Sequence, residues 1–419
     1  MSEPDAPEEA PPQRPLLRLR DPLPPVVETE AALAATCAAV AAGSGPVAID
    51  AERASGYRYS QRAYLIQLRR EGSGTHLVDP IPFASMAPLQ EVLDGTEWIL
   101  HAATQDLPCL ADVGLTPSAL FDTELAGRLL GYPRVGLATL VETLLGQRLA
   151  KEHSAVDWST RPLPEPWLEY AALDVEVLVE LRDVLAEELV ETGKDEWARQ
   201  EFDALRGFRP AVRVDAWRRT SGVHRVRGRR SLGAVRALWE LRDEIARERD
   251  VTPGRILPDS AIVAAASAMP TDRRTLLRTQ GFHGRGASRY ATQWVEALLA
   301  VGELPEEQLP TRAPRGDGPP LPRTWPEKDP VAARRLAAAK EAVAALSEEH
   351  GIPAENLLTP DHLRRVLWAP PATRVPEELA VAVDGLLQGF AARPWQRELM
   401  VPLLVDAVLA GDVEPEGTP

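Results

Sequence analysis

Four acidic residues, in three separated segments, are of the types that bind divalent metal ions, and a tyrosine accompanies the last of them. Asp50 and Glu52 occur in VAIDAER, Asp106 occurs in HAATQDL, and Tyr170 and Asp174 occur in YAALDVEVL. Carboxylates gathered at the edge of an apolar sheet repel one another unless a cation lies among them, and hard oxygen ligands favour Mg²⁺ or Mn²⁺ over zinc. Two such ions about 4 Å apart drive in-line hydrolysis of phosphodiesters. The five residues therefore predict a metal-dependent phosphodiesterase site.

The first segment is expected to present its acids on a strand, and the second is expected to present its acid on a helix that follows a strand. The apolar run at 45–53, bounded by a glycine-proline signal, predicts a buried strand. Asp50 and Glu52 are two residues apart, so both side chains should leave one face of that strand. A further strand is predicted at 97–102, and it leads into a helix that carries Asp106.

The third segment lies in a predicted long helix over 164–193, which starts after a proline. Tyr170 and Asp174 are four residues apart, so the phenol and the carboxylate should share one helical face. Strands alternating with helices predict an α/β fold. The other elements expected in this region are strands at 63–69, 75–80 and 119–123 and a helix at 136–146 that ends at a glycine.

The ordered motifs resemble ribonuclease D, a family of the DEDD exonuclease superfamily. VAIDAER resembles the first family motif, WILHAATQDLPCLADVGL the second, and YAALDVEVL the Tyr-x₃-Asp third motif of the tyrosine subclass. The segments at 121–131 and 151–163 also resemble family segments. The resemblance implies a ribonuclease-H-like fold, in which helices flank a central mixed sheet.

The same resemblance implies a mechanism. Asp50, Glu52, Asp106 and Asp174 would bind two Mg²⁺ or Mn²⁺ ions, and Tyr170 would orient the attacking water. The implied reaction hydrolyses the terminal phosphodiester at a free 3′ end of RNA and releases nucleoside 5′-monophosphates. The implied substrates include 3′ trailers of tRNA and other small structured RNAs.

Three residues near the motifs need separate interpretations. The family often has asparagine after the histidine of the second motif, but here Ala102 follows His101, so any substrate contact from that position is lost. Asp112 and Asp122 compete with Asp106 as candidate ligands. We interpret both as surface or capping residues, with Asp122 or its neighbour Thr123 capping the helix that follows.

The second half of the chain predicts helices in two similar blocks. One begins at 232–250 and the other at 332–351, about a hundred residues later in the chain. Pro253 corresponds to Pro353, and in both blocks a Pro-Asp pair follows a few residues on. The blocks resemble HRDC domains, the C-terminal modules shared by helicases and ribonuclease D. The second block lacks the glycine- and arginine-rich segment at 281–290, which leaves its role in binding open.

The predicted architecture is thus a ribonuclease-H-like α/β exonuclease domain followed by two all-α HRDC-type domains. The predicted units are a disordered acidic, proline-rich tail (1–25), the exonuclease domain (26–205), a basic linker (206–231), the first HRDC domain (232–305), a proline-rich linker (306–330) and the second HRDC-like domain (331–410).

Charge is distributed unevenly over these units. The net charge is −15, yet residues 206–300 carry 19 Lys and Arg against 9 Asp and Glu. A basic middle segment in an acidic chain indicates contact with a polyanion, although a solvated linker is the ordinary alternative. Trp217 within it is better explained as a packing anchor than as a base stacker. The candidates for nucleic-acid contact are Arg218, Arg219, Arg225, Arg227, Arg229, Arg230, Arg285 and Arg289.

Two alternative functions stay open on the sequence alone. The same carboxylates would serve a 3′–5′ exonuclease that acts on DNA, and the basic segment would serve a non-catalytic RNA-binding scaffold. The chain has no phosphate-binding GxxxxGK[ST] motif, so it is not a helicase. No secretory or membrane-spanning segment is evident, and no required protein partner is indicated. Cys37 and Cys109 fit no metal-binding spacing and are expected to be buried thiols in a reducing cytoplasm.

Overall fold

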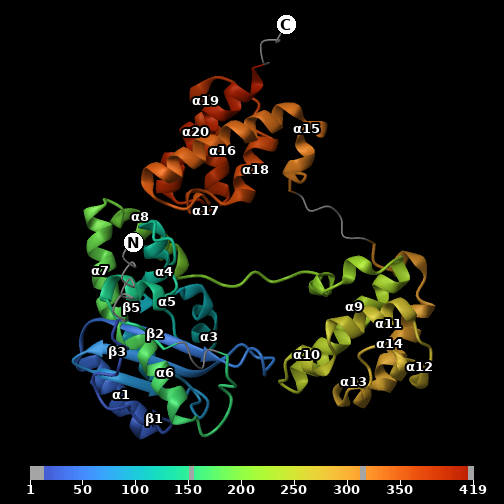
Figure 1. The fold of residues 1–419 in the computed structure, drawn as a ribbon, viewed down its shortest axis with the longest axis horizontal. Helices are drawn as coiled ribbons and strands as arrows, with labels where there is room; N and C mark the ends of the chain where they lie inside the picture. The colour runs from blue at the N-terminus through green and yellow to red at the C-terminus, as the bar shows by residue number, and fades with distance from the viewer. Residues whose placement is uncertain (1–13, 151–154, 312–317, 414–419) are drawn as a thin grey trace, which may run out of the picture.

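The structure, a computed structural model, describes residues 14–150, 155–311 and 318–413. They form an α/β domain and two helical domains (Figure 1). This arrangement confirms the predicted fold class. No helix in the described ranges is both long enough and apolar enough to cross a bilayer. Cys37 and Cys109 are both buried and unpaired, as expected.

The first domain is built on a six-stranded mixed sheet with the order β1-β4-β3-β2-β5-β6. Strand β3 pairs antiparallel with β2 and β4, whereas β5 pairs parallel with β2 and β6. The strands are β1 (Val26–Val27), β2 (Ser44–Arg53), β3 (Ala63–Glu71), β4 (Gly74–Val78), β5 (Glu97–Leu100) and β6 (Ala119–Asp122). All five predicted strands are present. Strand β5 ends two residues earlier than predicted because Ala102 has a positive φ of 58°, which no strand residue adopts.

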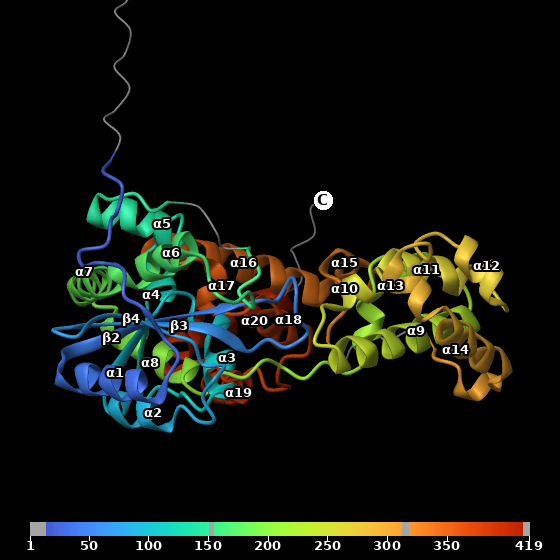
Figure 2. The same ribbon diagram turned by 90° about the horizontal axis from the view of Figure 1, so that it is seen from below.

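Helices cover both faces of this sheet (Figure 2). They are α1 (Glu30–Ala42), α2 (Ala87–Leu93), α3 (Leu107–Asp112), α4 (Thr123–Leu129), α5 (Leu137–Leu140), α6 (Glu165–Glu176), α7 (Leu178–Glu191) and α8 (Asp195–Leu205), with a 3-10 turn η1 (Ala103–Gln105) and a π-helical turn η2 (Val141–Leu145). Val47 and Ile49 of β2 pack into the core on the side of α1 and α2. Asp50 and Glu52 alternate with these residues, so they face the opposite side, where α6 lies.

The long helix predicted over 164–193 is in fact two helices, so that prediction was wrong in this respect. The chain bends at Val177, which is fully buried and separates α6 from α7. Helix α6 packs across β2, β3 and β4, while α7 packs against β2, β5 and α4. Because the sheet is twisted, the surface under α6 and the surface under α7 differ in direction, and one straight helix could not pack on both.

The prediction of a disordered tail over 1–25 needs correction for residues 14–25; residues 1–13 lie outside the described ranges. Leu17 is 5% exposed and belongs to the core between α4 and α7. Its N–H donates to the carbonyl of Arg148 (2.9 Å). The proline-rich composition suggested disorder, but Leu17 and the partly buried Leu19 pack against the core and hold this segment in place.

The first helical domain has its own apolar core. Its elements are η3 (Ala216–Arg219), η4 (Val223–Arg225), α9 (Arg229–Glu248), α10 (Pro253–Ile256), α11 (Asp259–Ala268), α12 (Arg273–Arg278), α13 (Arg285–Arg289), α14 (Ala291–Glu303) and η5 (Glu306–Gln308). Trp217 and Val226 are buried in this core beside Phe282 and Trp294. The predicted linker 206–231 is therefore shorter than expected, because its second half packs into the domain. Trp217 is a packing anchor, as predicted.

The second helical domain repeats the opening of the first. Its elements are η6 (Pro322–Thr324), α15 (Trp325–Lys328), α16 (Pro330–His350), α17 (Ala354–Leu357), α18 (Pro360–Trp368), α19 (Pro376–Gly389) and α20 (Pro394–Asp412). In both domains a helix of five or more turns leads to a one-turn helix and then to a helix with Pro at its start. This shared succession supports the predicted internal repeat.

Both helical domains contact the first domain. Trp395 at the start of α20 stacks on Trp197 of α8, with ring centroids 5.0 Å apart, and its indole N–H donates to Glu201 (3.0 Å). On the other helical domain, Asp243 accepts a hydrogen bond from the hydroxyl of Tyr59 (3.1 Å). Tyr59 lies in the loop that joins β2 to β3, a few residues along the chain from the predicted metal ligands Asp50 and Glu52.

Candidate active site

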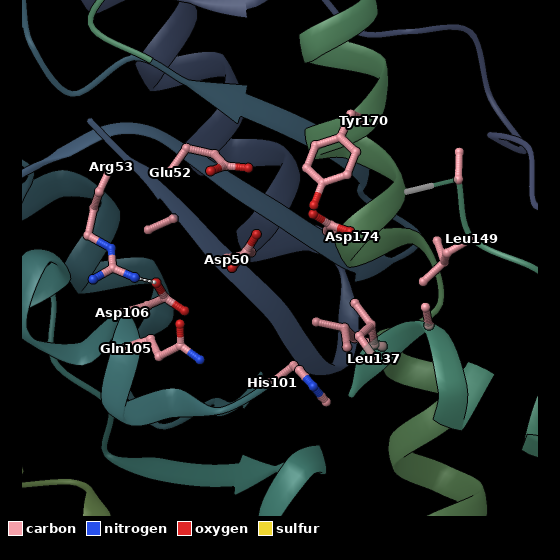
Figure 3. A pocket seen from close by; sticks show the side chains of 14 residues that line it. Asp50, Glu52, Arg53, His101, Gln105, Asp106, Leu137, Leu149, Tyr170 and Asp174 are labelled. Carbon is pink, nitrogen blue, oxygen red and sulfur yellow. Dashed lines mark ion pairs between the residues drawn. The ribbon is translucent and has the colours of Figure 1, made fainter. Parts of the chain in front are cut away.

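A cavity of about 500 Å³ lies between β2, η1, α5 and α6 in the first domain. All five residues predicted to do chemistry line it: Asp50, Glu52, Asp106, Tyr170 and Asp174 (Figure 3). They come from three segments spread over more than a hundred residues of sequence. The fold therefore brings the predicted set together in one place.

Three of the carboxylates converge closely. One oxygen each from Asp50, Glu52 and Asp174 lie within 4.8 Å of one another. Asp106, which is 5% exposed, lies on the other side of Asp50 and pairs with Arg53 at 3.6 Å. Asp50 thus lies between Glu52 and Asp174 on one side and Asp106 on the other.

Burial makes this cluster electrostatically unfavourable. Desolvation first, and repulsion from the neighbouring carboxylates second, raise the pKa of Glu52 to about 10 and the pKa of Asp106 well above its usual range. The pKa of Asp50 and that of Asp174 are raised as well, again chiefly by burial. Each of these four carboxylates makes ionisation of the others less favourable, so the fully ionised cluster is unstable by itself. Cations bound among the carboxylates would remove the repulsion.

The donor set fits hard divalent ions. Every converging ligand atom is a carboxylate oxygen, which suits Mg²⁺ and Mn²⁺ and does not suit a site selective for zinc. Asp50, Glu52 and Asp174 would hold one ion, and Asp50 with Asp106 would hold a second. The residues present therefore fit the metal chemistry that the motifs predict.

Tyr170 lies one helical turn before Asp174 on α6, and its hydroxyl points at the Asp174 carboxylate (Figure 3). Burial, followed by repulsion from Asp174 and Glu52, raises the pKa of this phenol. Tyr170 therefore keeps its proton at neutral pH and can donate a hydrogen bond. This placement agrees with the face shared by residues four apart on a helix.

Sequence reasoning missed Arg53 and His101, which also line the cavity. Strand alternation would send Arg53 to the face opposite Glu52, but the pairing of β2 with β3 shifts register between these two residues. Such an irregularity re-aims a side chain, and no local sequence pattern announced it. Arg53 is the only Arg or Lys among the described residues that line the cavity.

His101 follows the last residue of β5. Its Nδ1 lies 2.9 Å from the hydroxyl of Thr123, which in turn donates to the carbonyl of Leu100 (3.3 Å). The hydroxyl must then accept from the ring, so Nδ1 carries the proton. Burial lowers the pKa of His101 to about 4, so the ring is neutral at pH 7. The histidine of the second motif is the sequence signal for this residue.

The predicted nucleic-acid residues lie on the first helical domain and do not line the cavity. Several have structural partners. Arg229 donates to the carbonyl of Leu309 (2.5 Å), Arg230 to that of Gly302 (2.6 Å), and Arg218 to that of Thr311 (2.9 Å). The exposed members of the predicted set are Arg219, Arg225, Arg227, Arg285 and Arg289.

Comparison with known families assigns each domain. Residues 24–190 match the model described as 3′–5′ exonuclease, and residues 231–298 match the HRDC domain model. Residues 318–408 match a model described as 3′ to 5′ exonuclease C-terminal domain. The ribonuclease D of Gluconacetobacter diazotrophicus is 31% identical over 77% of this chain and 81% of its own length. The chain belongs to the ribonuclease D family. It is accordingly a hydrolase with a 3′–5′ exonuclease domain.

Solved structures extend this comparison. A protein from Bifidobacterium adolescentis has a TM-score of 0.85 and 34% identity, covering 94% of this chain and 99% of its own. The structure of Escherichia coli RNase D, described as an exoribonuclease involved in structured RNA processing, has a TM-score of 0.65 and 28% identity. It covers 87% of this chain and 99% of its own. The ribonuclease D fold therefore extends across all three domains.

Arg53 has a testable role in this ribonuclease D family member. It offsets the charge of buried Asp106, so Arg53→Gln should lower the free energy of unfolding by about 1–2 kcal/mol in EDTA. Saturating Mg²⁺ should shrink that difference, because bound ions then neutralise the same carboxylates. Urea unfolding of both proteins, with EDTA and with Mg²⁺, measures the effect. An equal loss in both conditions would contradict the assigned role.

Proposed function

We propose that this protein removes nucleotides one at a time from the free 3′ end of RNA, with two Mg²⁺ or Mn²⁺ ions held by Asp50, Glu52, Asp106 and Asp174. The observation that carries the proposal is the convergence of three carboxylate oxygens within 4.8 Å, with Asp106 beside them. When bound, the ions would lower the pKa of the attacking water and neutralise negative charge on the leaving 3′ oxygen.

The chain's own residues would orient the reaction. The protonated hydroxyl of Tyr170 would donate to, and so position, the water near Asp174. Leu137, Leu149 and Leu178 add apolar surface to the cavity beside the acids. The products would be nucleoside 5′-monophosphates, because the bond to the 3′ oxygen is the one that breaks.

A small structured RNA is the substrate class that the whole chain supports best, with 3′ trailers of tRNA as a candidate. The Escherichia coli relative is described as acting in structured RNA processing. The exposed arginines of the first helical domain, Arg219, Arg225 and Arg227 among them, would hold phosphates of the RNA body at a distance from the cavity. An acidic catalytic domain would in this way still bind a polyanion.

The proposal is tested with a 3′-extended structured RNA labelled at its 5′ end, incubated with the protein and Mg²⁺ or Mn²⁺. The expected result is a ladder of products that shorten by one nucleotide, with no ladder in EDTA or on RNA that carries a 3′-phosphate. A DNA copy runs alongside. Equal degradation of DNA would point to a general exonuclease, and tight RNA binding without cleavage would leave only the scaffold function.

Binding of the RNA body should depend on the exposed arginines. Arg225→Gln combined with Arg227→Gln should weaken binding of structured RNA in EDTA and reduce the slope of log affinity against log salt by about 2. Cleavage of a short single-stranded RNA should change little. Arg199→Gln, an exposed arginine on α8 that already pairs with Glu196, is the matched control. Fluorescence anisotropy across a salt series measures the affinity and its salt dependence. An unchanged slope in the double variant would show that Arg225 and Arg227 do not contact the RNA.

A further inference from the structure

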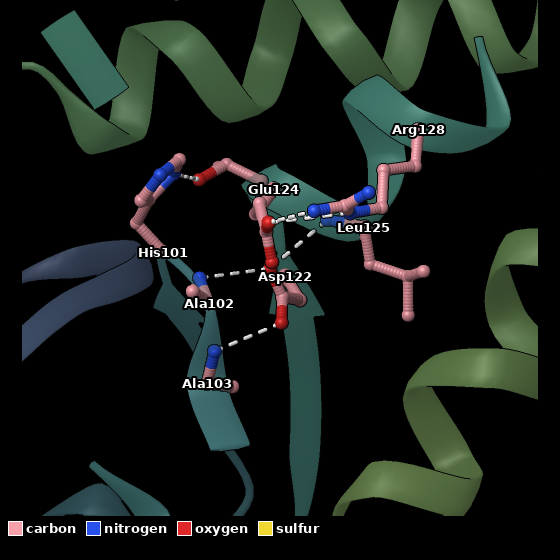
Figure 4. A network of polar contacts seen from close by, with 8 residues as sticks. His101, Ala102, Ala103, Asp122, Glu124, Leu125 and Arg128 are labelled. Carbon is pink, nitrogen blue, oxygen red and sulfur yellow. Dashed lines mark hydrogen bonds and ion pairs between the residues drawn. The ribbon is translucent and has the colours of Figure 1, made fainter. Parts of the chain in front are cut away.

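One buried carboxylate outside the metal-ligand set connects two segments of the site. Asp122, at the end of β6, is 2% exposed. It accepts hydrogen bonds from the backbone N–H groups of Ala102 (3.1 Å) and Ala103 (2.9 Å), which follow the neighbouring strand β5 (Figure 4). It also accepts from the N–H groups of Glu124 (2.9 Å) and Leu125 (3.1 Å), at the start of α4. A single carboxylate thus caps both η1 and α4.

The cap on α4 is ordinary, but the two bonds to the β5 side restrain an unfavourable backbone. Ala102 has φ 58° and ψ 52°, in the left-handed region. An L-residue with a Cβ costs about 1–2 kcal/mol there, and such conformations persist only where the surroundings hold them. The bonds from Ala102 and Ala103 to Asp122 supply this restraint, because they hold the peptide groups on both sides of the Ala102 Cα.

The restrained turn connects two residues that line the cavity, His101 and Asp106. His101 immediately precedes Ala102 and lines the cavity. On the other side, the N–H of Asp106 donates to the carbonyl of Ala103 (3.1 Å), and Asp106 ends η1. A change in φ at Ala102 would therefore rotate the peptide that leads to Asp106 and would move its carboxylate relative to Asp50.

We propose that Asp122 is a positioning residue of the active site, which holds the Ala102 turn so that Asp106 reaches the metal position that it shares with Asp50. Asp122 does not touch the cavity; it acts through backbone N–H groups. This inference rests on the proposed function, because it gives Asp106 a role as metal ligand. The sequence interpretation of Asp122 as a helix cap is correct but describes only half of its contacts.

The first test uses Asp122→Asn, which keeps the side-chain shape but leaves one oxygen and one NH₂ group facing four N–H donors. Removal of a residue that orients a metal ligand typically lowers metal affinity or activity by about 10–100-fold. We expect kcat for RNA hydrolysis to fall by that factor, with KM nearly unchanged. Mn²⁺ binding, followed by the electron paramagnetic resonance of free Mn²⁺ without RNA, should weaken at one of two sites.

Matched variants separate positioning from simple loss of stability. Asp272→Asn removes a helix cap of the same type on α12, far from the cavity, and should leave kcat and Mn²⁺ binding unchanged. Ala102→Gly in the Asp122→Asn background should restore at least a third of the lost Mn²⁺ affinity, since glycine adopts positive φ without restraint. Ala102→Val should reproduce the defect with the α4 cap intact, which keeps the test valid if Asp122→Asn does not fold.

The outcomes distinguish the two proposals. Parental kcat and parental Mn²⁺ binding in folded Asp122→Asn would overturn the positioning role, as would a defect that Ala102→Gly fails to relieve. An unmutated protein that binds two Mn²⁺ ions but cleaves no RNA would overturn the proposed function alone. In that case the Mn²⁺ measurements on these four variants still decide the role of Asp122.

Discussion

Asp50→Asn and Asp174→Asn are each expected to lower kcat for RNA hydrolysis by about 10³-fold or more. Each variant removes the charge of a carboxylate whose oxygen lies in the converging set, so ions in the cavity would lose a ligand and the attacking water would lose its activation. The assay is the rate at which 5′-labelled RNA is shortened at saturating Mg²⁺. RNA binding in EDTA should persist, because the exposed arginines lie on another domain.

The same substitutions should stabilise the metal-free protein. The pKa of Asp174 is raised by burial and by Asp50, so the folded state binds its proton more tightly than the unfolded state does. The ionised carboxylate of Asp174 therefore destabilises the folded state at neutral pH. This destabilisation disappears as the pH falls and the carboxylate is protonated in the unfolded state as well. Asparagine has nearly the same shape and no charge. We expect Asp174→Asn to raise the free energy of unfolding in EDTA by about 1–2 kcal/mol.

Asp112→Asn on α3 is the control for both effects, since Asp112 is exposed and does not line the cavity. It should alter neither kcat nor stability measurably. Full activity in Asp174→Asn would exclude this residue from the metal site. A loss of stability in EDTA would show that the carboxylate makes a net favourable contact in the metal-free fold.

Gly131→Ala is expected to detach the second helical domain from the exonuclease domain. Gly131 follows α4 with φ 82°, and a Cβ there would lie 2.2 Å from the carbonyl oxygen of Gly351, at the end of α16. No side chain can flex to relieve a contact between a Cβ and a backbone atom. The strain of positive φ and the displaced backbone together should cost about 2–4 kcal/mol.

The contact at Gly131 lies next to polar contacts between the two domains. The ammonium of Lys194 donates to the carbonyls of Leu129 (2.8 Å) and His350 (2.5 Å), the last turns of α4 and α16. A cation between two helix C-termini is favourable, and separation of the helices would remove both partners. The stacked pair Trp197 and Trp395 lies in the same interface, so its fluorescence should report the separation.

Gly114→Ala is the matched control for this variant. Gly114 has nearly the same φ, 85°, but nothing lies within 4 Å of its ideal Cβ position. It should cost only the backbone strain, about 1 kcal/mol, and should leave the tryptophan fluorescence unchanged. Thermal unfolding of both variants with fluorescence detection separates the clash from the strain. Equal effects of the two substitutions would contradict a tight contact at Gly131.

Much of the site could be predicted because its signals are local. The strand period of two placed Asp50 and Glu52 on one face, and the helical period placed Tyr170 with Asp174. Residue type then predicted the metal chemistry, since clustered carboxylates favour hard cations. The order of the motifs and of the helical blocks was sufficient to identify the family resemblance.

Other features depend on contacts between segments that are distant in sequence. Arg53 enters the cavity because β2 slips in register against β3, and Asp122 restrains the Ala102 turn because β6 lies beside β5. Neither partner can be inferred from residues nearby in the chain. The single helix predicted across Val177 failed for the same reason, since only the sheet and the neighbouring helices decide where the chain must bend.

The sequence by itself determined which residues can do chemistry here, because residue type and local period are properties of short segments. Only the tertiary structure decided how those residues are held and which arginines are structural, as Arg230 shows by bonding the end of α14. The physical reason is that register, docking and the pairing of buried polar groups are settled by the packing of distant segments. The capped turn before Asp106 and the interface at Gly131 are both features of that kind.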